Sequence, residues 1–296
     1  MEIAEGVHLI KCPFSRYFTS VCALVGDEVT LIDSGMPSSL DEAILPYLNS
    51  LGRKPEDVAY VILTHGHFDH CGGAAELKKR FSAKVVVHEL DRPLIEDPLL
   101  LDRLLYERFG PPPPPEEAPF PPVEPDITVK EGDFLKLSGR ELAFLHLPGH
   151  SAGSMAVLDR KLGLYVAGDS PQGRGPGRPL LFHSLTEYEN SMKRLSREAV
   201  NILILGHPFP PLEKPVLKDD EAKLHAQESL NAAVELREKV QTALNEARKP
   251  CMLEEVQAAL PGTQRVSIGC VLEALVKAGE AETLKRGMIP LWAPAR

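Results

Sequence analysis

Apolar and polar residues alternate through the N-terminal segment, which is the pattern of strands with one buried face. The alternation covers Val7–Ile10, Val21–Val25 and Val29–Ile32. Gly26 and Asp27 lie between the last two runs and predict a tight turn. The segment is therefore expected to begin with antiparallel strands.

Helical spacing and short apolar runs alternate in the following stretch, up to residue 109. A helix is predicted over Ser38–Leu51, and Pro46 should bend or shorten it. Val58–Leu63 and Lys84–His88 are predicted strands with a helix between them, and a helical stretch follows over Asp91–Phe109. This alternation predicts layered α/β structure.

The second half repeats the same logic with strands and one amphipathic helix. The helix is predicted over Thr186–Val200, with Thr186 as its N-cap and Glu189 as the capping-box partner. The predicted strands are Ile127–Leu137, Glu141–Leu147, Met155–Leu158, Gly163–Ala167 and Ile202–Leu205.

The character of the sequence changes from Asp220, which divides the chain into a domain over residues 1–215 and a smaller one over residues 220–296. A second compositional break, rich in proline, lies within the first domain. The Pro-rich insertion 110–125 cannot form an inner strand, and both an exposed spacer and a substrate lid remain open for it. The second domain is predicted to contain one long helix, two shorter helices over Met252–Leu260 and Val266–Ala278, and a hairpin that turns at Lys285–Met288.

The composition limits the classes of partner that the protein is expected to bind. A formal charge of −9 disfavours non-specific binding to nucleic acid or anionic membranes, and 43% hydrophobic residues suffice for a sizeable core. No signal peptide or long apolar span is evident, so a cytoplasmic location is expected. The five cysteines form neither a disulfide framework nor a C-x-x-C pair, and Cys71 is predicted to pack rather than to ligate a metal.

Three imidazoles and one carboxylate follow the strand Val58–Leu63 within six residues. They are His65, His67, Asp69 and His70, on the turn that leads into the next helix. Imidazole and carboxylate are the ligands that zinc and similar metals prefer. Because one ion cannot easily take all four ligands from so short a loop, we predict two neighbouring metal ions.

The spacing H-x-H-x-D-H at the end of a strand resembles the hallmark loop of the metallo-β-lactamase superfamily. Three later positions match the same family pattern, each following a predicted strand: His150 in Pro148-Gly149-His150-Ser151, Asp169 after Gly168, and His207 after Gly206. Asp33 matches an aspartate that orients the site from behind the ligands. Pro208 departs from the pattern, because the family commonly has glycine there.

The resemblance implies two ligand sets and a fold. His65, His67 and His150 would hold one ion, Asp69, His70 and His207 the other, and Asp169 would bridge them. Two zinc ions per chain are expected, with iron or manganese as alternatives. The implied nucleophile is a metal-bound hydroxide, and Asp69 and Asp169 are the predicted catalytic carboxylates. The implied fold is α/β (α+β), a four-layer αββα sandwich with a small C-terminal helical, winged-helix-like domain.

The leading predicted function is hydrolysis of a small thioester, lactone or related ester by an enzyme similar to glyoxalase II. A metal-dependent endoribonuclease or phosphodiesterase, a mononuclear iron persulfide dioxygenase and a non-catalytic metal-binding regulatory module are the alternatives. Because the charges of the C-terminal segment balance, we expect it to pack or to form a homodimer rather than to bind nucleic acid. The expected partner is a small-molecule substrate, and no membrane is expected.

Overall fold

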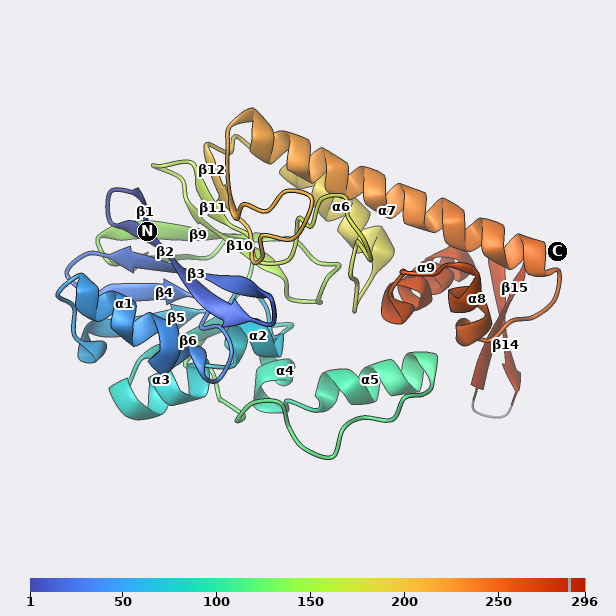
Figure 1. The fold of residues 1–296 in the computed structure, drawn as a ribbon, viewed down its shortest axis with the longest axis horizontal. Helices are drawn as coiled ribbons and strands as arrows, with labels where there is room; N and C mark the ends of the chain where they lie inside the picture. Colours follow the sequence, from blue (N-terminus) through green and yellow to red (C-terminus); the bar gives the residue numbers. More distant parts are fainter. Residues whose placement is uncertain (287–288, 296) are drawn as a thin grey trace.

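Two β-sheets face each other, and helices cover their outer faces. The computed structural model describes residues 1–286 and 289–295. Figure 1 shows the N-terminal sheet in blue beside the sheet formed by the later strands, with α6 and α7 on the far side of the second sheet. This four-layer arrangement confirms the predicted αββα sandwich.

The first sheet has the strand order β1-β2-β3-β4-β5-β6-β7. Its strands run antiparallel from β1 to β4 and parallel from β4 to β7. Their bounds are β1 (Glu2–Ala4), β2 (Val7–Phe14), β3 (Tyr17–Val25), β4 (Val29–Ile32), β5 (Val58–Ile62), β6 (Lys84–His88) and β7 (Ile127–Val129).

The second sheet has the order β13-β12-β11-β10-β9-β8, in which only β11 and β12 are parallel neighbours. Its strands are β8 (Phe134–Leu137), β9 (Arg140–His146), β10 (Met155–Asp159), β11 (Leu164–Val166), β12 (Ile202–Ile204) and β13 (Val216–Lys218). The sequence patterns did not reveal the short edge strands β1 and β13.

Alternating side chains build three cores from the two sheets. In β5, Val61 faces the helices outside the first sheet, while Ile62 faces the central core between the sheets. In β10, Val157 faces the central core and Leu158 faces the outer core of the second sheet. Because both faces of each sheet are covered, these strands are apolar throughout, as expected for the middle layers of a sandwich.

The helices account for most of the remaining structure. They are η1 (Leu40–Ile44), α1 (Leu45–Ser50), η2 (Pro55–Asp57), α2 (Phe68–Cys71), α3 (Ala74–Phe81), α4 (Arg92–Glu96), α5 (Leu100–Phe109), α6 (Leu185–Leu195), α7 (Asp220–Ala247), α8 (Leu253–Ala259) and α9 (Arg265–Lys277). The helix predicted around Pro46 begins as the π-helical turn η1 and continues as α1, with Pro46 in its first turn. None of the helices in the described residues is both long and apolar enough to cross a bilayer.

Three predicted elements were wrong in detail. The single strand expected over Ile127–Leu137 is two strands in different sheets, joined by a turn in which the Asp133 carboxylate accepts from the Lys130 amide. The helical stretch after Asp91 breaks between α4 and α5, because Pro98 has no N–H and disfavours helical backbone before it.

The N-cap predicted at Thr186 was also wrong. Helix α6 begins at Leu185, and its N-cap is Ser184, whose hydroxyl accepts a hydrogen bond from the Glu187 amide. Glu189 does not close a capping box but pairs with Arg237 of α7 at 3.4 Å.

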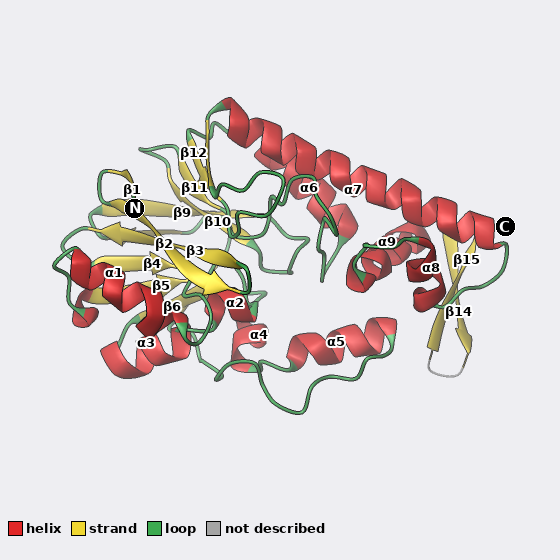
Figure 2. Ribbon diagram, in the orientation of Figure 1, coloured by secondary structure: helices red, strands yellow, loops and turns green. Residues whose placement is uncertain are grey.

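The C-terminal segment extends away from the second sheet along α7 to α8, α9 and the hairpin β14 (Ala281–Arg286) and β15 (Ile289–Pro294), as Figure 2 shows. The predicted turn residues Gly287 and Met288 lie outside the described residues. One continuous core contains Tyr165 and Leu203 of the second sheet together with Leu272 and Trp292 of the C-terminal segment. The similarity of the C-terminal segment to a winged helix stays a prediction.

Candidate metal centre

The strand ends of both sheets place the predicted site residues at one edge of the sandwich. In the first sheet, Asp33 directly follows β4, while His65 and Asp91 lie three residues beyond the parallel strands β5 and β6. In the second sheet, Asp169 and His207 follow the parallel neighbours β11 and β12. Carboxyl ends of parallel strands share one edge of a sheet, where ligands commonly bind.

The short helix α2 turns the remaining ligands of the metal loop inward. His67 is its N-cap residue in extended backbone, and its carbonyl accepts from the amides of His70 and Cys71, each at 2.9 Å. Asp69 and His70 are therefore carried on one tight helical turn that follows His65 and His67.

Two backbone hydrogen bonds hold the sheets together beside this loop. The Met155 amide donates to the Thr64 carbonyl at 3.0 Å, and the Ser20 amide donates to the Gly206 carbonyl at 2.7 Å. A Cβ atom at Gly206 would lie against Asp169 Oδ1 and the ring of His70, so only glycine allows the backbone to pass so close to the site.

His65, His67 and His150 form the first cluster of donors that could hold a metal ion. His67 Nδ1 lies 2.8 Å from His150 Nε2. His65 Nε2 is buried and has no hydrogen-bond partner among the described residues. A buried nitrogen without a partner is costly, and a metal ion at this point would satisfy it.

Asp69, His70 and His207 form the second cluster. His207 Nε2 lies 3.1 Å from Asp69 Oδ2 and 3.2 Å from His70 Nε2, and the third separation is 3.9 Å. Two donor atoms bound to one tetrahedral zinc ion at its usual bond lengths lie roughly 3.3–3.4 Å apart. The spacing of this cluster therefore fits one ion.

Asp169 lies between the two clusters and turns one oxygen toward each. Its Oδ1 atom lies 3.4 Å from His70 Nε2 and 3.6 Å from His207 Nε2, while its Oδ2 atom lies 3.7 Å from His150 Nε2. The structure thus brings all seven predicted ligands together. Six of them are buried, and Asp169 is partly exposed to the cavity described below.

Fixed acceptors orient the imidazoles so that their free nitrogens face the centre. The Nδ1 atoms of His150 and His207 donate to the carbonyls of Leu180 and Phe18, at 2.8 Å and 3.0 Å. His65 Nδ1 lies 3.1 Å from the hydroxyl of Thr64. Each of these bonds leaves Nε2 available as an electron-pair donor.

Asp33 holds His70 in the same way. Its Oδ2 atom accepts from His70 Nδ1 at 2.8 Å and from the Thr64 hydroxyl at 2.9 Å, and its Oδ1 atom accepts from the Thr64 amide at 2.7 Å. Asp33 has a φ of 64°, a left-handed conformation that aspartate tolerates better than most residues. Its position behind the ligands is the one that the sequence predicted.

The electrostatics of the cluster favour ionised carboxylates and, at His65 and His67 but not at His70, neutral imidazoles. Burial, together with the neighbouring imidazoles, lowers the pKa of His65 and His67 well below the ordinary value. Burial would raise the pKa of Asp169, but His207 and His70 outweigh it and hold that pKa well below its usual range. Burial would likewise lower the pKa of His70, yet the nearby carboxylates, Asp33 first, raise it well above normal.

Asp91 is a site residue that sequence reasoning missed. Its buried carboxylate accepts from the Gly66 amide at 2.8 Å, from the Ser151 hydroxyl at 2.6 Å and from the Gly153 amide at 2.6 Å. It therefore ties the loop of His65 and His67 to the loop that carries His150. Its position just beyond β6, beside the other strand ends, was the available signal.

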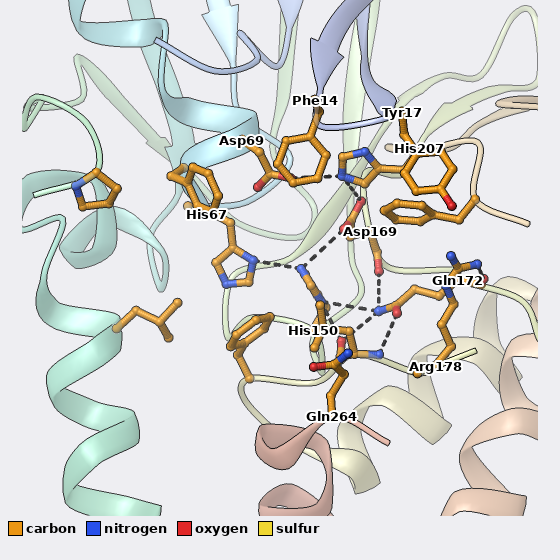
Figure 3. Close-up of a pocket in the computed structure, with 18 of the residues that line it drawn as sticks. Phe14, Tyr17, His67, Asp69, His150, Asp169, Gln172, Arg178, His207 and Gln264 are labelled. Atoms are coloured by element: carbon orange, nitrogen blue, oxygen red, sulfur yellow. Dashed lines mark hydrogen bonds and ion pairs between the residues drawn. The ribbon is translucent and has the colours of Figure 1, made fainter. Parts of the chain in front are cut away.

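A cavity of about 590 Å³ opens onto the metal centre, and five of the predicted ligands line it. Figure 3 shows His67 and Asp69 on one side of it, and Gln172, Arg178 and Gln264 beyond His150 on the other. Gln264 belongs to the C-terminal segment, while Pro119 and Phe120 belong to the Pro-rich insertion. The insertion thus lines the cavity.

The structure also places Cys71 and Pro208, the two positions that the sequence singled out beside the site. Cys71 is fully buried, and its thiol lies 3.6 Å from the Gly66 carbonyl in the outer core of the first sheet. Pro208 leads the chain into Phe209, whose ring lies 4.6 Å from that of His207 and lines the cavity.

The sequence of residues 17–207 matches the sequence model of the family described as the metallo-beta-lactamase superfamily. Hydroxyacylglutathione hydrolase GloC of Haemophilus influenzae is 30% identical over 169 residues, which cover 54% of this chain and 71% of that protein. Acyl-coenzyme A thioesterase MBLAC2 of Gallus gallus is 31% identical over 160 residues, which cover 49% of this chain and 55% of that relative.

A similar fold occurs in a metallo-beta-lactamase family protein from Thermus thermophilus. Its crystal structure matches with a TM-score of 0.78 at 22% identity, covering 99% of this chain and 100% of the other. The match therefore extends through the C-terminal helices as well as the sandwich.

Proposed function

This chain belongs to the metallo-beta-lactamase superfamily, and we propose that it is a hydrolase that uses two zinc ions to cleave a small thioester or a related ester. Hydrolysis of a thioester breaks the carbon–sulfur bond; water supplies a hydroxyl to the acyl carbon and a proton to the sulfur. The products are a carboxylic acid and a thiol.

The observation that carries the proposal is the placement of Asp169 between two clusters of donor atoms that lie close enough together to hold a metal ion. One carboxylate oxygen faces His70 and His207, and the other faces His150. A pair of divalent ions held there would supply an activated water and polarise a carbonyl group.

The other residues of the site prepare it for this chemistry. Asp33 and the carbonyls of Leu180 and Phe18 fix the imidazole tautomers, so the donor atoms are in place before any ion arrives. Asp91 holds the two ligand loops at a constant separation. The chain thereby avoids the cost of ordering its ligands at the moment of binding.

A thioester is favoured over a nucleic acid by the relatives and by the cavity. One relative is named as a hydrolase of hydroxyacylglutathione and another as an acyl-coenzyme A thioesterase. The cavity is lined by many apolar side chains, and the chain has a net charge of −9, which disfavours a polyanion.

The direct test combines metal analysis with a panel of substrates. Purified protein is expected to contain two zinc ions per chain and to hydrolyse thioesters faster than a lactone, a phosphodiester or single-stranded RNA. A single iron with oxygen uptake, or cleavage of RNA alone, would contradict the proposal.

Asp169→Ala is expected to lower metal occupancy and to remove nearly all turnover, because the alanine leaves both clusters without their shared oxygen donor. Asp27→Ala is the matched control, since Asp27 is exposed in the turn between β3 and β4. Full metal content and an unchanged rate in Asp169→Ala would refute the bridging role.

A further inference from the structure

The cavity beside the metal centre has two chemically unlike walls. One wall is formed by α4, α5 and the Pro-rich insertion 110–125, and the other by the loop after β11 together with the start of α9. Five of the predicted metal ligands lie between them (Figure 3). An elongated molecule that reaches the ligands can therefore contact both walls.

The first wall is almost entirely apolar. It consists of Leu94, Leu101, Leu105, Pro119 and Phe120, and Phe182 from the loop after β11 adjoins it. The Phe182 ring lies 4.7 Å from that of His67, so the apolar surface begins directly at the first donor cluster. The one charged side chain on this wall is Asp102, whose pKa is raised by burial.

The opposite wall presents Arg178. Its guanidinium stacks on the ring of Phe209 at 4.4 Å, and Nη1 donates to the Gln172 carbonyl at 3.1 Å. Within the described part of the chain, that is the only hydrogen bond of this guanidinium, and no carboxylate lies within ion-pair distance of it. Its remaining N–H groups are therefore available to a ligand.

A comparison with Arg108 shows how unusual this is. Arg108 is also half-buried, yet it pairs with Glu273 at 2.7 Å and donates to the carbonyls of Phe182 and His183. A half-buried guanidinium normally acquires such partners, because leaving its donors unused is costly. Arg178 has no such carboxylate partner among the described residues, and an anionic group that entered the cavity would supply one.

We propose that the substrate is a thioester of an apolar acyl chain with a thiol that carries an anionic group, and that the chain lies on the α4–α5 wall while Arg178 binds the anion. This inference rests on the proposed thioester hydrolysis. The orientation puts the carbon–sulfur bond between the two walls, at the donor clusters. The cavity of about 590 Å³ is large enough for the reacting part of such a molecule, while the rest of the thiol extends toward solvent.

The acyl side is tested by a series of acetyl, butanoyl, hexanoyl, octanoyl and decanoyl thioesters of coenzyme A with the zinc-loaded full chain. Each methylene that enters an apolar site is expected to raise kcat/KM by up to about fourfold, until the cavity is filled. Leu101→Ala should lower kcat/KM for octanoyl about tenfold and leave acetyl nearly unchanged. Leu104→Ala is the matched control, because Leu104 lies on the same helix but is 41% exposed and does not line this cavity.

The anionic side is tested with Arg178→Gln. Its kcat/KM is expected to fall about tenfold to a hundredfold for thioesters of coenzyme A or glutathione, mainly through KM, because charge-assisted hydrogen bonds are lost. Thioesters of the neutral thiol N-acetylcysteamine should lose less than about threefold, since they carry no anion for Arg178 to bind. This contrast separates loss of recognition from misfolding, which would lower both rates together.

The outcomes separate the two proposals. Rates that rise with chain length, together with an Arg178→Gln defect confined to anionic thiols, support the inference. Thioester hydrolysis that is independent of chain length, or equal effects of Leu101→Ala and Leu104→Ala, would overturn the inference and leave the proposed function standing. If the zinc-loaded protein cleaves no thioester of any length, the proposed function itself fails.

Discussion

Asp91→Asn is expected to weaken one metal site and to spare the other. Asp91 bonds to the Gly66 amide, which lies between His65 and His67, and to Ser151 and Gly153, which follow His150. Among the residues that the structure describes, its side chain makes no such contact with the second cluster. The loss should therefore fall on the set formed by His65, His67 and His150.

The magnitude follows from the geometry of the carboxylate. All three contacts of Asp91 are donors, so the amide nitrogen of asparagine must face at least one of them and break that bond. A hydrogen bond to a charged group contributes about 1.5–3 kcal/mol, which corresponds to a factor of roughly ten to a hundred and fifty. Removal of a residue that orients metal ligands typically costs about tenfold to a hundredfold in affinity, which agrees.

The stability of the metal-free protein should change less than these bonds imply. Burial raises the pKa of Asp91, so its stabilising contribution is full below the pKa of the unfolded chain and is lost as the pH rises through the higher folded pKa. At pH 7 the buried charge opposes folding, and asparagine removes that opposition. Metal affinity is therefore the better measurement.

The assay is zinc competition against a chromophoric chelator, with the protein first stripped of metal. Asp91→Asn should show one site weakened about tenfold to a hundredfold and one within about threefold of the parent protein. Asp97→Asn is the control, since Asp97 lies at the end of α4 and pairs with Arg103. Equal weakening of both sites, or of neither, would refute the assigned role of Asp91.

Three further predictions concern other parts of the molecule. Asp33→Asn should weaken zinc binding by the second cluster about tenfold or more in the same competition assay, because His70 loses its carboxylate acceptor, and unchanged affinity would contradict this. Truncation after Lys218 should lower the melting temperature sharply or prevent folding, since α7 and the following elements share one core with Tyr165 and Leu203, and a truncated protein that melts like the full chain would disprove it. Burial and His146 lower the pKa of His88 to about 4, so its stabilising contribution is present above the ordinary histidine pKa and is lost as the pH falls through about 4. In denaturant unfolding between pH 7 and pH 4, the free energy of unfolding should therefore fall less in His88→Asn than in the parent protein. An equal fall in both proteins would exclude His88 as the cause.

Local sequence determined the metal loop and the layered fold. After the strand that begins at Val58, four chelating side chains occur in a span of six residues. Because they share one short turn from strand to helix, their side chains must lie close together. The alternation of strands and helices likewise follows local periodicity, because the sheets bury both faces and the longer helices bury one face in the three cores.

Local sequence could not assign strands to sheets or place every helix end. Ile127–Leu137 forms two strands in different sheets. The pattern of apolar residues in a strand does not show to which of the two sheets the strand belongs. Ser184 rather than Thr186 caps α6, because both residues offer a hydroxyl and only the entering backbone decides between them.

Tertiary structure alone decided what surrounds the metal ligands. Asp91 accepts hydrogen bonds from three donors on two distant loops, and the residues next to Asp91 in the sequence do not predict these bonds. The N–H groups of Arg178 are available to a ligand because no carboxylate of the described residues pairs with them, and this depends on how all the neighbouring segments pack. Chelating side chains act through their own chemistry and can be recognised in sequence, whereas a cavity is defined by the space that distant side chains leave between them.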